Sequence, residues 1–214
     1  MIESEVSIPA EGVDLGGELI VPSGALGLVL FAHGSGSSRH SPRNQFVART
    51  LREAGLGTLL FDLLTADEEG AEAETRHLRF NIRFLAERLI AATRWAQARP
   101  STANLNFGYF GSSTGAGAAL MAAASLGNDI RAIVSRGGRP DLAGEALRKV
   151  ASATLLIVGG EDRVVIQLNK QAYDELRSEK DFQIVPGATH LFEEPGTLEI
   201  VAALAAKWFA DHLN

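Results

Sequence analysis

The chain has 214 residues, of which 46% are hydrophobic, and a formal net charge of −6. This length suits one domain with a sizeable core, so we expect residues 1–214 to form a single domain. The acidic balance and the absence of a long basic run argue against nucleic acid or an anionic membrane as the main partner. The chain has no cysteine, which excludes disulfides, thiolate metal sites and a cysteine nucleophile.

The first residues and the hydropathy pattern both favour a cytoplasmic protein. The chain starts Met1-Ile2-Glu3-Ser4-Glu5, which is acidic where a signal peptide is basic. No apolar stretch approaches the ~18 uncharged residues that a transmembrane helix needs. We therefore expect a cytoplasmic location.

Apolar runs separated by turn residues predict alternating strands and helices in the first half. Strands are expected at residues 5–8, 13–21, 26–32 and 58–63, and a helix from 41 to about 55. The acidic segment 65–75 is expected to be a loop, either a lid over a site or a simple connection. Residues 76–99 read as one long amphipathic helix ended by Pro100. Its arginines, Arg76, Arg79 and Arg83, are expected on a solvated face that pairs with the acidic loop.

The second half continues the same alternation. Strands are expected at 105–110, 129–135, 154–158 and 181–185, and helices up to 126, after 141, at 164–178 and at 198–213. Strands that alternate with helices form right-handed βαβ units. We expect an α/β fold, with a mostly parallel, doubly wound sheet and helices on both faces. No segment is long enough to predict a cap domain.

The stretch Gly111-Ser112-Ser113-Thr114-Gly115 carries the strongest chemical signal. It has the form G-x-S-x-G and lies between an apolar strand and a helix of small residues. This context is typical of a nucleophile elbow, in which a strained turn exposes a serine hydroxyl above the sheet. Glycines two residues before and after the serine leave room between strand and helix. The pattern predicts Ser113 as a nucleophile.

A serine hydroxyl needs a base and an acid, and both are expected at later strand ends. Of the five histidines, only His190 follows a late strand, in a loop before the last helix. Asp162 follows the strand at 154–158 and is the first choice for the acid, although it also suits a helix N-cap. Glu161 and Asp141 remain alternatives.

An oxyanion hole needs two backbone N–H groups. One is expected from Thr114, the residue after the nucleophile, at a helix N-terminus. The glycine-rich loop after the strand at 26–32 is expected to supply the other, from Ser35 or, failing that, Gly36. His33 in this loop is interpreted as a structural residue rather than a base.

Four motifs in chain order now resemble a known family. They are Phe31-Ala32-His33-Gly34-Ser35-Gly36, the elbow, Gly159-Gly160-Glu161-Asp162 and Gly187-Ala188-Thr189-His190. Together they resemble the α/β-hydrolase superfamily, and most closely its dienelactone hydrolase-like branch, over nearly the whole chain. The resemblance implies an uncapped hydrolase domain with a triad of Ser113, Asp162 and His190. The branch is known for a cysteine nucleophile, whereas this chain has serine, so its dienelactone substrate is not carried over.

Weaker signals concern the substrate. Arg136 directly follows a strand and would suit a substrate carboxylate, the alternatives being exposure or a salt bridge to Asp141 or Asp162. Three side chains could make apolar contacts to an acyl or alcohol group: Leu63, Leu64 and Phe192. For each of them, ordinary packing in the core is the competing interpretation.

These residues predict a serine esterase acting on a small or accessible carboxylic ester through an acyl-enzyme, with no metal or organic cofactor. A thioesterase, an amidase or small peptidase, and an acyltransferase would use the same triad. A hydrolase-fold protein that only binds a ligand is the non-catalytic alternative. The expected partner is a small-molecule ester, and the chain is expected to be a monomer or a homodimer.

Overall fold

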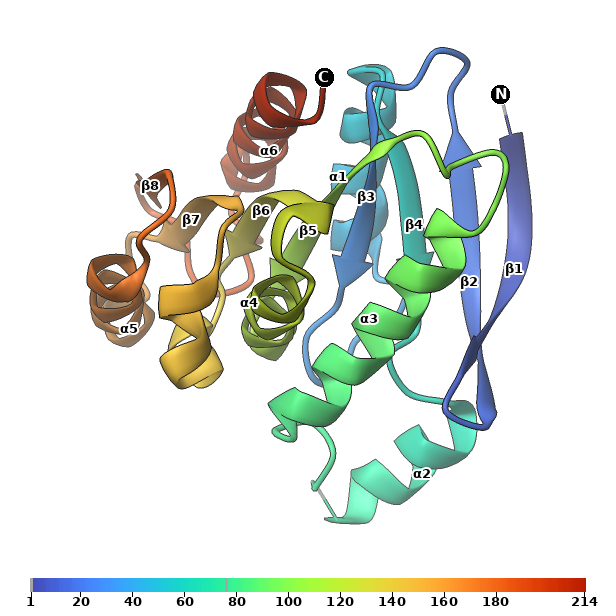
Figure 1. The fold of residues 1–214 in the computed structure, drawn as a ribbon. Coiled ribbons are helices and arrows are strands. Elements are labelled where there is room, and N and C mark those ends of the chain that lie inside the picture. Colours follow the sequence, from blue (N-terminus) through green and yellow to red (C-terminus); the bar gives the residue numbers. More distant parts are fainter. Residues whose placement is uncertain (1, 76) are drawn as a thin grey trace.

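The computed structural model describes residues 2–75 and 77–214, and the side chains of 72–75 lie outside the description, as does Arg76. Eight strands form one sheet in the order β1-β2-β4-β3-β5-β6-β7-β8 (Figure 1). Their bounds are β1 Ile2–Ala10, β2 Val13–Val21, β3 Gly27–Ala32, β4 Gly57–Phe61, β5 Asn106–Ser112, β6 Ile130–Arg136, β7 Ala153–Gly159 and β8 Lys180–Val185.

The sheet is antiparallel at one edge and parallel elsewhere. β1 pairs with β2 and β2 with β4 in antiparallel register, and the strands from β4 to β8 pair in parallel. The two-residue turn between β1 and β2 has positive φ at Glu11 (47°) and Gly12 (87°), as a tight hairpin turn requires. The mostly parallel sheet predicted from the sequence is confirmed.

Helices cover both faces of this sheet. Their bounds are α1 Pro42–Glu53, α2 Ala66–Thr75, α3 Ile82–Gln97, α4 Thr114–Leu126, α5 Arg163–Glu175 and α6 Thr197–Leu213, and the 3-10 segments are η1 Gly127–Asp129 and η2 Pro140–Lys149. Residues of α3, α4 and α5 share one apolar cluster, and residues of α1 and α6 share the other. The core is therefore two layers with the sheet between them. Along the described chain, no helix is both long and apolar enough to cross a membrane.

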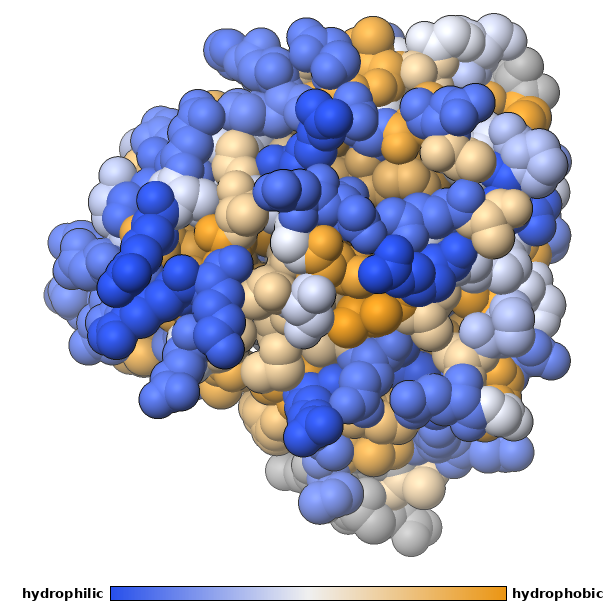
Figure 2. All heavy atoms as spheres, in the orientation of Figure 1, coloured by the Kyte–Doolittle hydropathy of each residue, from blue (hydrophilic) through white to orange (hydrophobic). Residues whose placement is uncertain are grey.

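Hydrophilic side chains cover much of the face seen in Figure 2, with hydrophobic residues exposed in smaller patches between them. The apolar strands β3, β4 and β7 are buried along their whole length. Continuous burial is what a parallel sheet covered on both faces imposes on its central strands.

The segment predicted as an acidic loop is a helix, and this corrects the sequence interpretation. Thr65 and Glu68 form a reciprocal N-terminal cap: the Thr65 N–H donates to the Glu68 carboxylate (2.8 Å), and the Glu68 N–H donates to the Thr65 hydroxyl (3.2 Å). The predicted helix over 76–99 instead begins at Ile82, because the Asn81 side chain caps it by accepting the Phe84 N–H at 3.2 Å.

Candidate active site

Ser113 occupies a strained turn between β5 and α4. Its φ of 50° and ψ of −124° lie where non-glycine residues are rare. A Cβ on Gly111 would lie 2.5 Å from the Ala116 Cα, and one on Gly115 would lie 2.1 Å from the Ala32 carbonyl oxygen. Both glycines are thus required by close backbone approach, which explains the G-x-S-x-G pattern.

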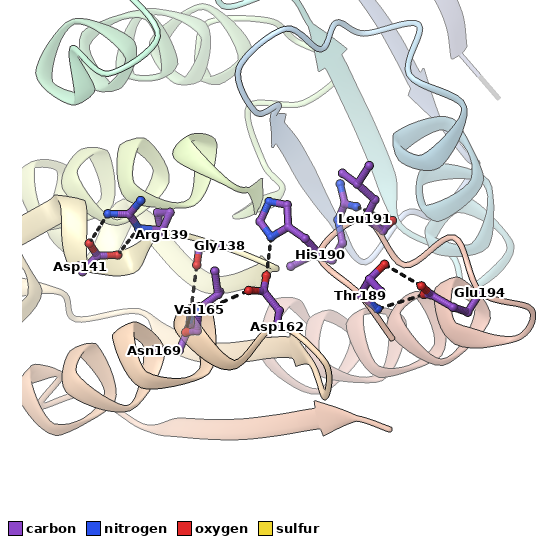
Figure 3. A network of polar contacts seen from close by, with 11 residues as sticks. Gly138, Arg139, Asp141, Asp162, Val165, Asn169, Thr189, His190, Leu191 and Glu194 are labelled. Carbon is purple, nitrogen blue, oxygen red and sulfur yellow. Dashed lines mark hydrogen bonds and ion pairs between the residues drawn. The ribbon is translucent and has the colours of Figure 1, made fainter. Parts of the chain in front are cut away.

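Asp162 and His190 come together from two different strand ends (Figure 3). The Nδ1–H of His190 donates to Oδ2 of Asp162 at 2.7 Å, and the Asp162 side chain is 15% exposed. Asp162 also caps α5, with Oδ1 3.4 Å from the Val165 nitrogen. Of the alternatives, Asp141 forms a two-pronged pair with Arg139, and Glu161 has an exposed side chain. The geometry therefore favours Asp162 over Asp141 and Glu161 as the carboxylate that pairs with His190.

The loop that carries His190 is held by a contact that the sequence did not reveal. Glu194 accepts hydrogen bonds from the Thr189 hydroxyl (2.6 Å) and the Thr189 N–H (3.1 Å), which hold the pKa of its carboxyl below the usual range. Glu194 carries no motif of its own, so only the folded loop shows this role. The pair fixes the backbone immediately before His190.

The predicted oxyanion-hole residues face one another beside the elbow. The Ser35 and Thr114 hydroxyls are 3.1 Å apart, and neither backbone N–H of these two residues has a hydrogen-bond acceptor within the described part of the chain. A Cβ on Gly34 would lie 2.9 Å from the Ser113 Cβ, so glycine allows the loop to pass close to Ser113. Gly36 has a φ of 68° and completes a turn in which Ser37 N–H donates to the Gly34 carbonyl (3.1 Å).

His33 joins two loops and lies in the interior. Its Nε2 accepts the Leu63 N–H at 3.0 Å, and its Nδ1–H donates to the Gly34 carbonyl at 3.0 Å. Burial lowers the pKa of His33, because the charged ring would lose its solvation. This is the structural position predicted for it.

Two cavities meet at the loop of Ser35. The larger cavity, of about 530 Å³, is lined mainly by polar residues. The smaller, of about 220 Å³, is lined by three leucines, Leu63, Leu64 and Leu85, together with the charged residues Glu69 and Arg79. Ser113, His190 and Arg136 line the larger cavity, whereas Thr114 and Leu63 line the smaller one. Within the described residues, no three histidine, aspartate or glutamate side chains are grouped so that they could hold a metal ion.

The four predicted substrate contacts differ in position. Arg136 is 6% exposed and lines the larger cavity, and its predicted alternative partners Asp141 and Asp162 pair with other residues. Leu63 and Leu64 are both buried but line the smaller cavity. Phe192 is 1% exposed and belongs to the apolar cluster under α6, so its ring lies in the core and lines neither cavity.

Comparisons with known proteins agree with this architecture. Two proteins named "Putative phosphoribosyl transferase", from two strains of Mycobacterium tuberculosis, are 56% identical to the chain over 211 residues. The match covers 99% of this chain but 47% of theirs, so the chain spans about half the length of these curated relatives.

Solved structures show the same fold. A dienelactone hydrolase from Anabaena variabilis is 55% identical, with a TM-score of 0.97, and the match covers 100% of this chain and 99% of that one. Est1E from Butyrivibrio proteoclasticus shares only the fold, at 16% identity and a TM-score of 0.81 over 97% of this chain and 98% of that one.

The model of the dienelactone hydrolase family matches residues 19–213, which include the elbow, the carboxylate–histidine pair and the loop of Ser35. The chain therefore has the α/β-hydrolase fold and belongs to the dienelactone hydrolase family.

Proposed function

We propose that the chain is a serine hydrolase that cleaves small or accessible carboxylic esters. The observation that carries the proposal is the strained Ser113, which lines the same cavity as His190 while Asp162 holds His190 Nδ1 at 2.7 Å. With Nδ1 engaged, Nε2 is the ring nitrogen left to exchange a proton with a substrate or with serine.

In the first half of the reaction, His190 Nε2 takes the proton of the Ser113 hydroxyl as its oxygen attacks the ester carbonyl. The carbonyl π electrons move to oxygen, and the backbone N–H groups of Ser35 and Thr114 stabilise the oxyanion. The tetrahedral intermediate collapses, the bond to the alkoxy oxygen breaks, and His190 donates its proton to the leaving alcohol. Ser113 is left acylated.

In the second half, His190 Nε2 takes a proton from water, and the resulting hydroxide attacks the acyl carbon. Collapse of the second intermediate breaks the bond to the Ser113 oxygen, which regains a proton from His190 as the acid leaves. Asp162 stays ionised and stabilises the imidazolium in both halves.

The same arrangement would serve a thioester, an amide or an acyl acceptor other than water. The phosphoribosyl transferase name of the relatives belongs to proteins about twice as long as this chain. We favour hydrolysis for this chain because the elbow presents a serine nucleophile beside a carboxylate-bound histidine in an open cavity.

The proposal is tested by labelling with a fluorophosphonate and measuring the intact mass of the product. Wild type is expected to gain one adduct, and Ser113→Ala none. Ser112→Ala is the matched control, because it removes the adjacent hydroxyl from β5 and is expected to keep the label. A folded wild type that stays unlabelled would contradict the proposal.

Kinetics on p-nitrophenyl acetate then test the roles. Ser113→Ala or His190→Ala is expected to lower turnover by up to about 10⁶-fold, and loss of the acid by less. Asp162→Asn is paired with Glu161→Gln as its control. Activity lost in Glu161→Gln but kept in Asp162→Asn would assign the acid to Glu161. A panel of esters of increasing chain length, with lactones and thioesters, identifies the preferred acyl group.

A further inference from the structure

Asn169 is a fully buried polar side chain in the middle of α5. It is 0% exposed, and its Nδ2 group donates two hydrogen bonds, to the Val165 carbonyl one turn earlier (2.8 Å) and to the Gly138 carbonyl (2.9 Å). Its Oδ1 has no donor within the described structure, and a buried polar atom without a partner costs free energy. An apolar side chain of similar size would avoid that cost. Packing alone therefore does not account for an asparagine here, and its bond to Gly138 joins two separate elements.

The carbonyl at the far end of that bond belongs to a short loop after β6, residues 137–139, which we call the bridging loop. The Arg139 N–H donates to the Ser113 carbonyl at 2.9 Å, and the same carbonyl also accepts a bond within α4. At the other end of the loop, Gly137 has a φ of 52°, and a Cβ on it would lie 3.0 Å from the His190 carbonyl oxygen. The bridging loop therefore lies against the backbones of both Ser113 and His190.

The bridging loop is held firmly on several sides. The Gly137 N–H donates to a carbonyl of β7 at 2.8 Å. A Cβ on Gly138 would lie 2.0 Å from the Ser135 Oγ, so the loop packs directly on the end of β6. The Arg139 guanidinium donates two hydrogen bonds of 2.8 Å to Asp141 (Figure 3). A hydrogen bond to this loop is thus a bond to a fixed point.

Helix α5 carries Asp162 at its start. Asp162 is the N-cap, and Asn169 lies about two turns further along on the same side of the helix. The Asp162 carboxylate accepts the His190 Nδ1–H at 2.7 Å, and Figure 3 shows this bond and the bond from Asn169 to Gly138 in one view. The amide of Asn169 therefore ties the helix that bears Asp162 to the loop that binds the Ser113 carbonyl.

We propose that Asn169 is a positioning residue, which holds Asp162, and with it His190, in place relative to Ser113. Asn169 lines neither cavity of the candidate site, so it acts through Asp162 and not on the substrate. The inference rests on the proposed ester hydrolysis, because it requires Ser113 and His190 to react together. A displacement of about 1 Å caused by a change far from the reacting atoms can lower a rate by about 100-fold.

The test replaces the amide by an apolar side chain of similar size, in Asn169→Leu. Inactivation by a fluorophosphonate is followed over a range of probe concentrations, which separates the limiting rate of reaction with serine from the apparent affinity for the probe. The limiting rate is expected to fall by about 10- to 100-fold. The apparent affinity is expected to stay at the wild-type value, because Asn169 lines neither cavity. A wild-type limiting rate in folded Asn169→Leu would overturn the proposal.

Two further variants of α5 serve as controls. Gln167→Leu removes an exposed amide from the same helix and is expected to keep the wild-type rate. Ala172→Gly weakens the same helix through its low helix propensity, leaves both hydrogen bonds of Asn169 in place, and is expected to keep the rate as well. An equal loss in Ala172→Gly and Asn169→Leu would reduce the effect to helix stability and overturn the proposal. Asn169→Ser, which also removes the amide, is used if leucine prevents folding, and the same loss of rate is expected.

A double-mutant cycle with Asp162→Ala tests whether Asn169 acts through Asp162. In that background the contact between α5 and His190 is already lost, so Asn169→Leu is expected to lower the limiting rate by less than about twofold further. A further loss of 10- to 100-fold would show an effect independent of Asp162 and overturn the proposal.

The same labelling separates this inference from the hydrolase proposal. A labelled wild type with an unaffected Asn169→Leu variant would overturn the positioning role alone. A folded wild type that stays unlabelled would overturn ester hydrolysis and, with it, the positioning role.

Discussion

Backbone strain at a single residue links the sequence pattern to reactivity. Ser113 adopts a φ of 50° and a ψ of −124°, and the surrounding strand, helix and Gly34 loop hold it there. Such strain costs on the order of 1–3 kcal/mol and persists only where the rest of the fold compensates for it. The same strain lifts the hydroxyl out of the helix and into the cavity with His190.

Two variants at this position measure the strain. Ser113→Gly is expected to be more stable than Ser113→Ala by about 1 kcal/mol, because glycine adopts positive φ without a steric penalty and loses part of that gain through backbone entropy. Urea denaturation of the two variants provides the comparison. Equal or reversed midpoints would show that the turn is not strained.

His33 makes stability depend on pH. Its folded-state pKa is lowered by burial, so the unfolded chain binds more protons just below the ordinary value of about 6.5. Its contribution is therefore complete above pH 6.5 and is lost as pH falls below it, by at most about 1.4 kcal/mol per pH unit. His33→Gln keeps an acceptor for the Leu63 N–H but cannot titrate.

The expected result is a steeper loss of unfolding free energy between pH 6.5 and 5 in wild type than in His33→Gln, measured by urea denaturation. The difference between the two curves removes the contribution of the other histidines. Parallel curves would mean that protonated His33 is tolerated in the fold.

At the scale of elements, a partly buried ion pair joins α2 to α3. Arg88 on α3 is 3% exposed, and its Nη2 donates to Glu68 at 2.7 Å. Glu68 also caps α2 through Thr65. Because Glu69 from the same helix lines both cavities, the pair positions one wall of the candidate site.

Glu68→Gln is expected to loosen α2. The substitution leaves the Arg88 charge buried without its carboxylate partner. Breaking a fully buried ion pair costs about 3–5 kcal/mol of unfolding free energy, and because Glu68 is partly exposed this range is an upper limit here. Hydrogen exchange should rise over α2 and remain low in β3 and β5. The control is Glu87→Gln, which removes the exposed pair with Arg83 and should cost less than about 0.5 kcal/mol. Unchanged exchange over α2 in Glu68→Gln would show that the pair does not anchor it.

The elements that the sequence predicted are those whose cause is local. The elbow is readable because Gly111 and Gly115 avoid backbone contacts that any Cβ would make. Asp162 and His190 were predicted to meet because the carboxyl ends of parallel strands lie at one edge of a sheet. Helix α2 was missed although its cap, Thr65 with Glu68, is visible in the sequence, because its charged residues gave no clear apolar face.

Non-local features were not predictable in this way. Within the described residues Arg136 has no carboxylate partner, because Asp141 pairs with Arg139 and Asp162 with His190. Phe192 is buried in the apolar cluster that includes residues of α6. The hydrogen bonds from Thr189 to Glu194 depend on how the loop between β8 and α6 folds. None of these leaves a periodic pattern in the chain.

At the scale of the whole molecule, α6 closes one face of the sheet near its centre. Leu213 packs on Gly27 at the start of β3, and the Asn106 side chain at the start of β5 donates to the Leu213 carbonyl at 3.1 Å. The last turn of α6 therefore packs against the starts of β3 and β5. Phe209 of α6 is fully buried against β5, where Gly108 leaves space for its ring.

A double-mutant cycle tests how tightly α6 packs against β5. A Cβ on Gly108 would lie 2.8 Å from the Phe209 ring and 3.1 Å from the Ala132 carbonyl oxygen, so Gly108→Ala is expected to cost about 1–3 kcal/mol by overpacking. Phe209→Leu makes room, so the double variant should be more stable than the sum of the single effects, by about 0.5–3 kcal/mol. Gly70→Ala is the control, because nothing lies within 4 Å of the added methyl group and alanine favours the helix. Urea denaturation measures the unfolding free energies of wild type, the two single variants and the double variant, and that of the control. Additive effects of the two substitutions would show that α6 shifts to accept the added methyl group and is not tightly packed against β5.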